Sequence, residues 1–286
     1  MNSWQIGEVK VSCIVETELP VSYYEKYPFI REATPEALKN IPWLYPNFVT
    51  DEGVLRLSIH ALLIEAPGLR LLVDTCIGND KPRKITGNKS LHTEFLGTLA
   101  ATGCPRETID VVVCTHLHVD HVGWNTMKVG SSWAPTFPNA RYLIGRQEFE
   151  YWSQDESEDQ IPVMLDSVTP IFDAGLADLV ETDHVISPQI RLRPTIGHTP
   201  GHVSVMIESE GQTALITGDS MHHPCQIARP DWAVTFDEDQ ATAISCRKSL
   251  LEEVADSSVL VIGTHFASPT AGHIVRDGET YKLLNQ

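Results

Sequence analysis

The chain has 286 residues, of which 42% are hydrophobic, enough to bury a substantial core within one domain. Its 38 acidic residues outnumber its 21 basic residues and give a net charge of -17, which disfavours nucleic acids and anionic membranes as partners. No stretch approaches the roughly 18 apolar residues of a membrane span, and the first residues lack the apolar core of a signal peptide. Six scattered cysteines fit free thiols in a reducing compartment. We therefore expect a cytoplasmic protein.

The predicted elements are groups of strands separated by helices, and the first group predicts an antiparallel sheet at the start of the fold. Strands are predicted from β-branched or alternating segments at 9–16, 54–65, 69–74, 109–114, 191–196, 203–208, 214–217 and 259–262. Helices are predicted at 91–102, 145–153 and 239–255. No linker divides the chain, so these elements predict a single α/β domain over residues 1–286, with two sheets and outer helices.

A segment rich in prolines and aromatic residues, 19–50, interrupts this pattern as an insertion. It holds five prolines and seven aromatic residues. Such a segment can close over a site as a lid or form the arm of a homodimer. The alternative is that its rings only pack it onto the core, and a mixture of these roles is the interpretation we favour.

The chemistry begins directly after the predicted strand at 109–114. The motif His116-x-His118-x-Asp120-His121 places three imidazoles and a carboxylate within six residues. A loop at the end of a strand can direct these side chains to one point, and neutral imidazole is the commonest protein ligand for zinc. The motif therefore predicts a metal site.

The same motif resembles the signature of the metallo-β-lactamase superfamily, and the remaining ligands follow in the expected order. These are His202 in Gly197-His198-Thr199-Pro200-Gly201-His202, Asp219 after Gly218, and His265 after Thr264. Asp74 matches the family's early aspartate, which braces the ligand loop. The resemblance implies an αββα sandwich of two mixed sheets with outer helices.

The resemblance also implies a dinuclear centre. One metal takes His116, His118 and His202, the other takes Asp120, His121 and His265, and Asp219 bridges the two. His198 is interpreted as structural. Zinc is the default for a nitrogen and oxygen ligand set, with manganese, iron or cobalt as alternatives.

The C-terminal third contains Asp219-Ser220-Met221-His222, the segment 233–239, Thr264-His265 and Gly272-His273-Ile274. With these segments it resembles the methyl parathion hydrolase branch, which includes lactonases, arylesterases and organophosphate hydrolases. The resemblance implies an enzyme that cleaves an ester or lactone of a small uncharged substrate by attack of a metal-bridging hydroxide, oriented by Asp120. His222 stands where acyl-homoserine lactonases place a tyrosine, and is a candidate for hydrogen bonding or proton transfer to the substrate. The alternative is that His222 only supports the metal ligands or lines the pocket wall. The alternatives are an organophosphate triester hydrolase, an acyl-homoserine lactonase, and a metal-binding protein without turnover.

Four residues next to the ligands are predicted to contact a small-molecule substrate. They are Trp124, Met221, His223 and Phe266, of which three are bulky and apolar. The loop 78–89 carries four basic residues, and we expect it to be mainly a solvated surface.

Overall fold

The computed structural model describes residues 2–285, and their tertiary contacts form two compact units. Unit 1 comprises 3–17 and 59–182, and unit 2 comprises Asn2, 18–58 and 183–285. Strands β2 (Val9–Val21) and β3 (Leu55–Ala66) each contain residues of both units. Whether the chain folds as the single domain predicted above stays a prediction.

The first sheet has seven strands in the order β1-β2-β3-β4-β5-β8-β9. Its other strands are β1 (Ser3–Ile6), β4 (Leu69–Val73), β5 (Val111–Cys114), β8 (Arg141–Gly145) and β9 (Ala177–Val180). The sheet is mixed, because β3 and β4 are antiparallel whereas β4, β5, β8 and β9 run parallel. A separate hairpin pairs β6 (Thr126–Val129) with β7 (Ser132–Pro135).

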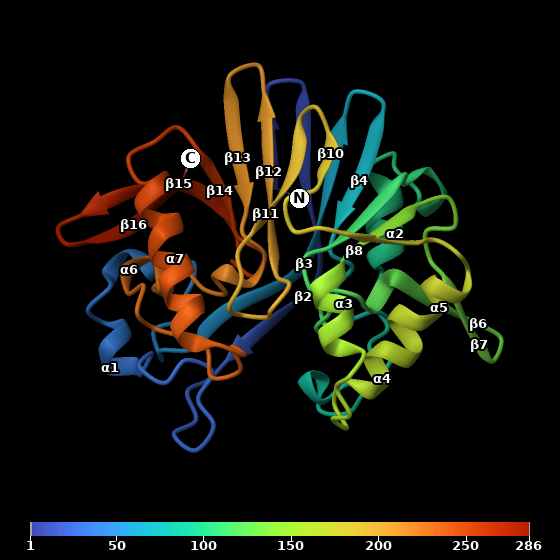
Figure 1. Ribbon diagram of the computed structural model, residues 1–286. Helices are drawn as coiled ribbons and strands as arrows, with labels where there is room; N and C mark the ends of the chain where they lie inside the picture. The colour runs from blue at the N-terminus through green and yellow to red at the C-terminus, as the bar shows by residue number, and fades with distance from the viewer. Residues whose placement is uncertain (1, 286) are drawn as a thin grey trace. The chain divides into compact units, whose positions relative to one another are not determined.

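The helices of unit 1 are short, and they lie between its strands along the chain (Figure 1). They are η2 (Lys84–Thr86), α2 (Phe95–Ala101), η3 (Arg106–Thr108), η4 (Gly123–Asn125), α3 (Arg146–Trp152), α4 (Ile161–Val163), η5 (Met164–Val168) and α5 (Thr169–Asp173). The predicted helices at 91–102 and 145–153 correspond to α2 and α3. Helix α2 begins later than predicted, at Phe95.

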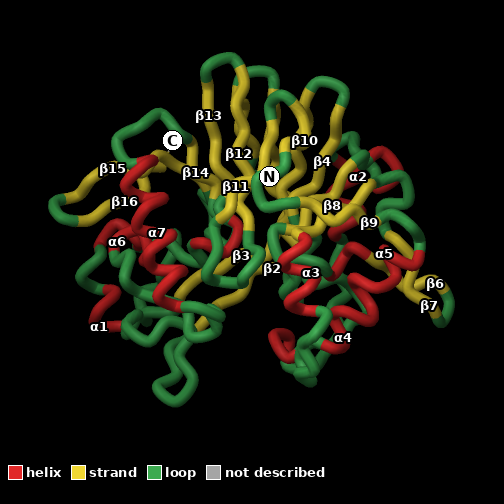
Figure 2. The backbone as a smooth tube through the Cα atoms, viewed as in Figure 1, coloured by secondary structure: helices red, strands yellow, loops and turns green. Residues whose placement is uncertain are grey.

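The second sheet, in unit 2, has the order β10-β11-β12-β13-β14-β15-β16 and is also mixed, since only β13 and β14 are parallel. Its strands are β10 (Val185–Ser187), β11 (Ile190–Pro194), β12 (Val203–Ser209), β13 (Gln212–Ile216), β14 (Leu260–Ile262), β15 (Ala271–Asp277) and β16 (Thr280–Asn285). The helices of unit 2 are α1 (Pro35–Leu38), η1 (Pro42–Leu44), η6 (Gly218–Ser220), α6 (Cys225–Ala228) and α7 (Gln240–Val254). Figure 2 distinguishes these helices from the strands by colour. No helix in residues 2–285 is long and apolar enough to cross a membrane.

The parallel pairing of β5 fixes the place where the loop 116–121, which carries the metal motif, leaves the first sheet. Strand β5 lies between parallel β4 and β8, in the registers Val113↔Val73 and Val113↔Leu143. Val112 and Val113 are completely buried, which anchors β5 in the interior. The motif starts two residues after Cys114, so its loop emerges at the carboxyl end of a buried parallel strand, the edge where α/β sheets commonly bind ligands.

The insertion 19–50 contributes to the hydrophobic core of unit 2. Leu44 and Phe48 are buried in the same apolar cluster as Met221 and Phe266. The ring of Phe48 lies 6.5 Å from that of Phe266. These contacts give the insertion a structural role in packing, while a further role as lid or dimer arm stays a prediction.

The expectation of a solvated basic loop at 78–89 is wrong for two of its cations. Lys81 is completely buried, and its Nζ donates to the carbonyls of Gly123 and Thr126 at 2.5 and 2.8 Å and to Thr126 Oγ1 at 3.0 Å. Arg83 pairs with Asp166 at 2.5 Å. Burial lowers the pKa of Lys81 to about 7. Lys81 therefore ties η4, which directly follows the metal motif, to the preceding loop.

Replacing Lys81 with methionine is expected to destabilise the protein strongly, because it leaves buried carbonyl acceptors without their donor. The expected loss is roughly 2–4 kcal/mol in the free energy of unfolding, measured by urea denaturation. Lys84→Met is the matched control, since that side chain is 77% exposed and pairs with exposed Asp159. Equal, small losses in the two variants would contradict the bracing role of Lys81.

Candidate metal centre

In unit 1 the ligand loop presents its histidines with defined ring orientations. Nδ1 of His116 lies 3.1 Å from Thr115 Oγ1, and its Nε2 lies 3.0 Å from Nδ1 of His118. Nε2 of His121 lies 3.6 Å from a carboxylate oxygen of Asp120. Two ligands of one tetrahedral zinc ion are about 3.3 Å apart, given bonds of about 2.0–2.1 Å. These spacings suit a shared metal ion, as the motif predicts.

Asp74 braces this loop, as the resemblance implies. Its carboxylate accepts the backbone N–H of Thr115 at 2.8 Å and lies 2.9 Å from Nδ1 of His121. The backbone of Asp74 has a φ of 59°, an uncommon value for a residue other than glycine. The strain is retained where one carboxylate fixes both ends of the loop and directs Nε2 of His121 away from it.

A second carboxylate, which the sequence did not reveal, holds the middle of the loop. Glu148 on α3 is buried and accepts the N–H of Leu117 at 3.1 Å and the indole N–H of Trp152 at 2.5 Å. The amide of Gln160 donates to the carbonyl of Leu117 at 2.9 Å. The Trp152 ring lies 5.1 Å from that of His118. Leu117, which lies between His116 and His118, is thus held by Glu148 on α3, 31 positions further along the chain.

Unit 2 centres its polar residues on Asp219, which lies on η6 directly after β13. The carboxylate is 3% exposed. Three imidazole nitrogens surround it: Nε2 of His222 at 3.1 Å, of His265 at 3.2 Å and of His198 at 3.5 Å. His198, Asp219 and His222 form a group whose ligand atoms all lie within 4.8 Å of one another. Asp219 and His265 are brought together as predicted, whereas His198 was not expected there.

Hydrogen bonds at the far side of two of these rings assign their tautomers. Nδ1 of His198 lies 2.8 Å from Asp237 Oδ1, and Nδ1 of His265 lies 3.1 Å from the carbonyl of Ser58. Each Nδ1 therefore donates, and each Nε2 directs a lone pair at Asp219. Lone pairs repel a carboxylate unless a cation lies between them. The donor set therefore fits a divalent metal ion.

His202, predicted as a ligand, has both ring nitrogens engaged within unit 2. Its Nδ1 lies 2.9 Å from the carbonyl of Thr195, and its Nε2 accepts the backbone N–H of Asp219 at 2.7 Å. A Cβ on Gly218 would lie 2.6 Å from the same Nε2. A neutral imidazole has only one lone pair for a metal or a hydrogen-bond donor. These contacts favour His198 in place of His202 as the ligand.

A buried arginine holds the residues behind His198. Arg247 on α7 is completely buried, and its Nη2 lies 3.9 Å from Oδ2 of Asp237. Its Nε donates to the carbonyl of Ser220 at 3.0 Å. Arg247 thus links the carboxylate that orients His198 to the residue directly after Asp219. No periodicity or motif in the sequence marks Arg247 for this role.

Three of the predicted substrate contacts are buried in apolar surroundings. Trp124 is 4% exposed, donates to Glu16 at 2.6 Å and stacks on Phe95 with ring centroids 5.6 Å apart. Met221 and Phe266 are completely buried in the core of unit 2. Their contacts indicate a role in packing. The prediction that these three residues contact the substrate, which was based on their closeness to the ligands in the sequence, therefore lacks structural support.

His223, the fourth predicted substrate contact, also has both ring nitrogens in hydrogen bonds. Nε2 lies 2.9 Å from the carbonyl of Phe48, and Nδ1 accepts the N–H of Cys225 at 3.1 Å. Burial lowers the pKa of His223 to about 4, although the bond to Phe48 opposes this shift. These contacts support a structural role that joins the insertion to the loop after Asp219.

Acid should destabilise the protein through His223. Because its folded pKa of about 4 lies below the unfolded value near 6.5, the unfolded state binds more protons between these limits, and stability falls as the pH is lowered through them. The loss attributable to this group is about 3 kcal/mol, and His223→Gln should remove it. Urea unfolding of the metal-free protein from pH 7.5 to 4 measures this slope. The exposed His92→Gln is the control, and an unchanged slope in His223→Gln would refute the assignment.

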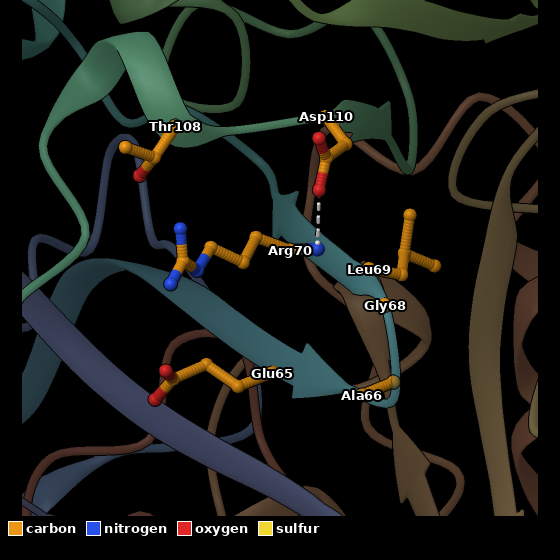
Figure 3. A pocket seen from close by; sticks show the side chains of 7 residues that line it. All are labelled: Glu65, Ala66, Gly68, Leu69, Arg70, Thr108 and Asp110. Carbon is orange, nitrogen blue, oxygen red and sulfur yellow. Dashed lines mark hydrogen bonds between the residues drawn. The ribbon is translucent and has the colours of Figure 1, made fainter.

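A surface pocket of about 560 Å³ lies elsewhere in unit 1 (Figure 3). It is lined by Glu65, Ala66, Gly68, Leu69, Arg70, Thr108 and Asp110. Asp110 accepts the N–H of Arg70 at 2.8 Å and directly precedes β5. The ligand loop follows β5, so this pocket lies at the opposite end of that strand and is not part of the metal centre.

Two mixed sheets and histidine-rich loops at the carboxyl ends of β5 and β13 define a metal-binding α/β protein. The sequence profile of the metallo-beta-lactamase superfamily matches residues 54–265. The chain belongs to this superfamily and has its fold, as predicted from the motifs.

Curated relatives and solved structures agree with this membership. N-acyl homoserine lactonases of Bacillus sp and Bacillus cereus are both 25% identical to this chain, over 234 and 230 residues respectively. Each alignment covers 76% of this chain and 84% of the relative. The dizinc quorum-quenching lactonase AidC superposes with a TM-score of 0.82 at 20% identity, covering 100% of this chain and 97% of that chain. The hydrolase AbOPH gives the same TM-score and coverages at 22% identity.

Proposed function

We propose that this protein is a hydrolase that binds two zinc ions and cleaves an ester or lactone bond in a small, uncharged, apolar substrate. The observation that carries the proposal is the buried carboxylate of Asp219 with three imidazole nitrogens around it at 3.1–3.5 Å. Superfamily membership supports it, as do the curated relatives that are lactonases. Six free cysteines support a reducing, cytoplasmic compartment as part of the same proposal.

The proposed ligand set keeps most of the predicted residues and changes one. One zinc ion would be held by His116, His118 and His198, the other by Asp120, His121 and His265, and Asp219 would be shared between the two. His198 replaces His202 because the contacts of His202 occupy both of its nitrogens. His121 and His265 direct Nε2 as ligands, since their Nδ1 atoms face Asp74 and Ser58.

The bound ions would lower the pKa of the attacking water and polarise the substrate carbonyl. Asp120 would orient that water by accepting a hydrogen bond from it. When the carbon–oxygen bond breaks, the departing oxygen requires a proton. We propose that His222, whose Nε2 lies 3.1 Å from the Asp219 carboxylate, supplies this proton or donates a hydrogen bond. Nδ1 of His222 has no hydrogen-bond partner within residues 2–285.

An N-acyl homoserine lactonase is the second candidate function. The names of the curated relatives favour it. The replacement of the lactonase tyrosine by His222 changes the group beside the substrate and leaves lactone cleavage chemically open to the same ligands. An organophosphate triester fits the same proposed centre as a neutral substrate.

Competition between substrate classes tests this proposal. Zinc-loaded protein should give higher kcat/KM for uncharged aryl esters or lactones than for phosphodiesters, β-lactams or thioesters, with phosphotriesters between, because an acidic chain disfavours extended anions. If phosphodiesters, β-lactams or thioesters are preferred more than tenfold, the ester or lactone assignment fails.

A further inference from the structure

Two phenylalanines of unit 2 form an aromatic wall beside His222. The Phe29 and Phe236 ring centroids lie 5.8 and 5.5 Å from that of His222, both edge to face, and 5.3 Å from each other. The Phe236 ring also lies 5.8 Å from that of His198. Phe236 is 44% exposed, whereas His222 is 2% exposed. An exposed apolar face therefore adjoins the buried polar residues around Asp219.

Backbone contacts fix both phenylalanines in place. The N–H of Thr235 donates to the carbonyl of Phe29 at 3.0 Å, and an antiparallel bridge pairs Ile30 with Val234. On the other side of Phe236, Asp237 holds His198 at 2.8 Å. The wall is therefore attached to the insertion on one side and to the proposed metal ligands on the other.

One cavity that Phe29 helps to line is too small to receive a substrate group. It measures about 10 Å³, roughly one water-sized probe, and is lined by Val21, Ile30 and Leu55 among others. Phe236 is partly exposed, so an apolar group can contact the pair on the exposed side of its ring. Covering such a face removes apolar surface from water on both partners.

We propose that Phe29 and Phe236 bind the apolar acyl chain of the substrate and make chain length a determinant of specificity. The inference rests on the proposed function, since it places the chain beside the ester or lactone carbonyl. It also gives the insertion 19–50 a role in substrate selection through Phe29. Binding the chain in the transition state raises kcat/KM with each methylene buried, up to the extent of the wall.

A chain-length series of acyl lactones, from butanoyl to decanoyl, tests the wall. For the zinc-loaded protein, the octanoyl to butanoyl ratio of kcat/KM should be about tenfold or more, because buried methylenes add binding energy. The ratio should fall below about threefold in Phe29→Ala and Phe236→Ala and be largely retained in Phe236→Leu. Tyr27→Ala, which removes a 76% exposed ring from the same insertion, should leave the ratio unchanged. A flat series in the unmodified protein, or an unchanged ratio in both alanine variants, overturns the proposal.

A binding measurement separates failure of the wall from failure of the proposed function. Calorimetric titration with butanoate and octanoate needs no turnover, and octanoate should bind more tightly to the unmodified protein than to Phe236→Ala. If no lactone is hydrolysed but this difference appears, the proposed function fails and the wall stands. Equal octanoate affinities in the two proteins overturn the wall. Zinc content and the melting temperature of each variant are measured alongside, to show that the ligands near Phe236 are intact.

Discussion

Asp219→Asn should lower turnover by roughly a thousandfold and reduce the amount of bound zinc. The substitution keeps the size of the side chain but removes the negative charge toward which three imidazoles converge. Zinc content is measured after gel filtration, and turnover is measured with an aryl ester. Asp231→Asn is the matched control, because that carboxylate is 72% exposed and pairs with Lys248 at the surface.

Full zinc content together with near-normal turnover in Asp219→Asn would contradict the bridging assignment. Loss of zinc with retained turnover would contradict the metal-dependent reaction itself. The two readouts are therefore needed together.

The second large effect concerns two histidines four residues apart. His198→Ala should lose about one zinc ion per chain and most of the turnover, because it removes a proposed ligand. His202→Gln should keep its zinc and lose roughly 1–3 kcal/mol in the free energy of unfolding, because its nitrogens hold Thr195 and the backbone of Asp219. The reverse pattern, with zinc lost only in His202→Gln, would restore the ligand set predicted from the sequence.

The choice between His198 and His202 shows what the motif cannot specify. Gly-His-Thr-Pro-Gly-His places two imidazoles in one turn, and either has suitable chemistry. The decision depends on partners far away in sequence: Asp237 orients His198, and the N–H of Asp219 saturates His202. The local sequence contains neither contact. The loop 116–121 was predictable because its chemistry and its strand are contiguous.

The predicted substrate contacts show a different limit. Adjacency to a ligand says nothing of direction, because successive side chains in strands and loops point to different sides. Met221 and Phe266 follow proposed ligands and face the core instead. Phe29 and Phe236 lie far from each other in sequence and meet only because the insertion pairs with residues 234–235.

The secondary structure likewise divides into elements that the sequence pattern predicts and elements that it does not. Long periodic segments such as 239–255 were identified, and α7 covers Gln240–Val254. Short elements such as α4, α5, β6 and β7 were not predicted, because three to five residues carry no measurable period. The insertion was recognised by composition alone, and its packing on the core of unit 2 depends on contacts such as Phe48 with Phe266.

Zinc titration of the metal-free protein, with bound zinc and aryl ester hydrolysis measured at each step, tests the central claim most directly. The protein should be inactive after chelation, bind two zinc ions per chain, and reach full hydrolysis as the second ion binds. Hydrolysis that persists undiminished without metal, or two bound ions with no hydrolysis of any ester or lactone, would contradict a dinuclear metal-dependent hydrolase.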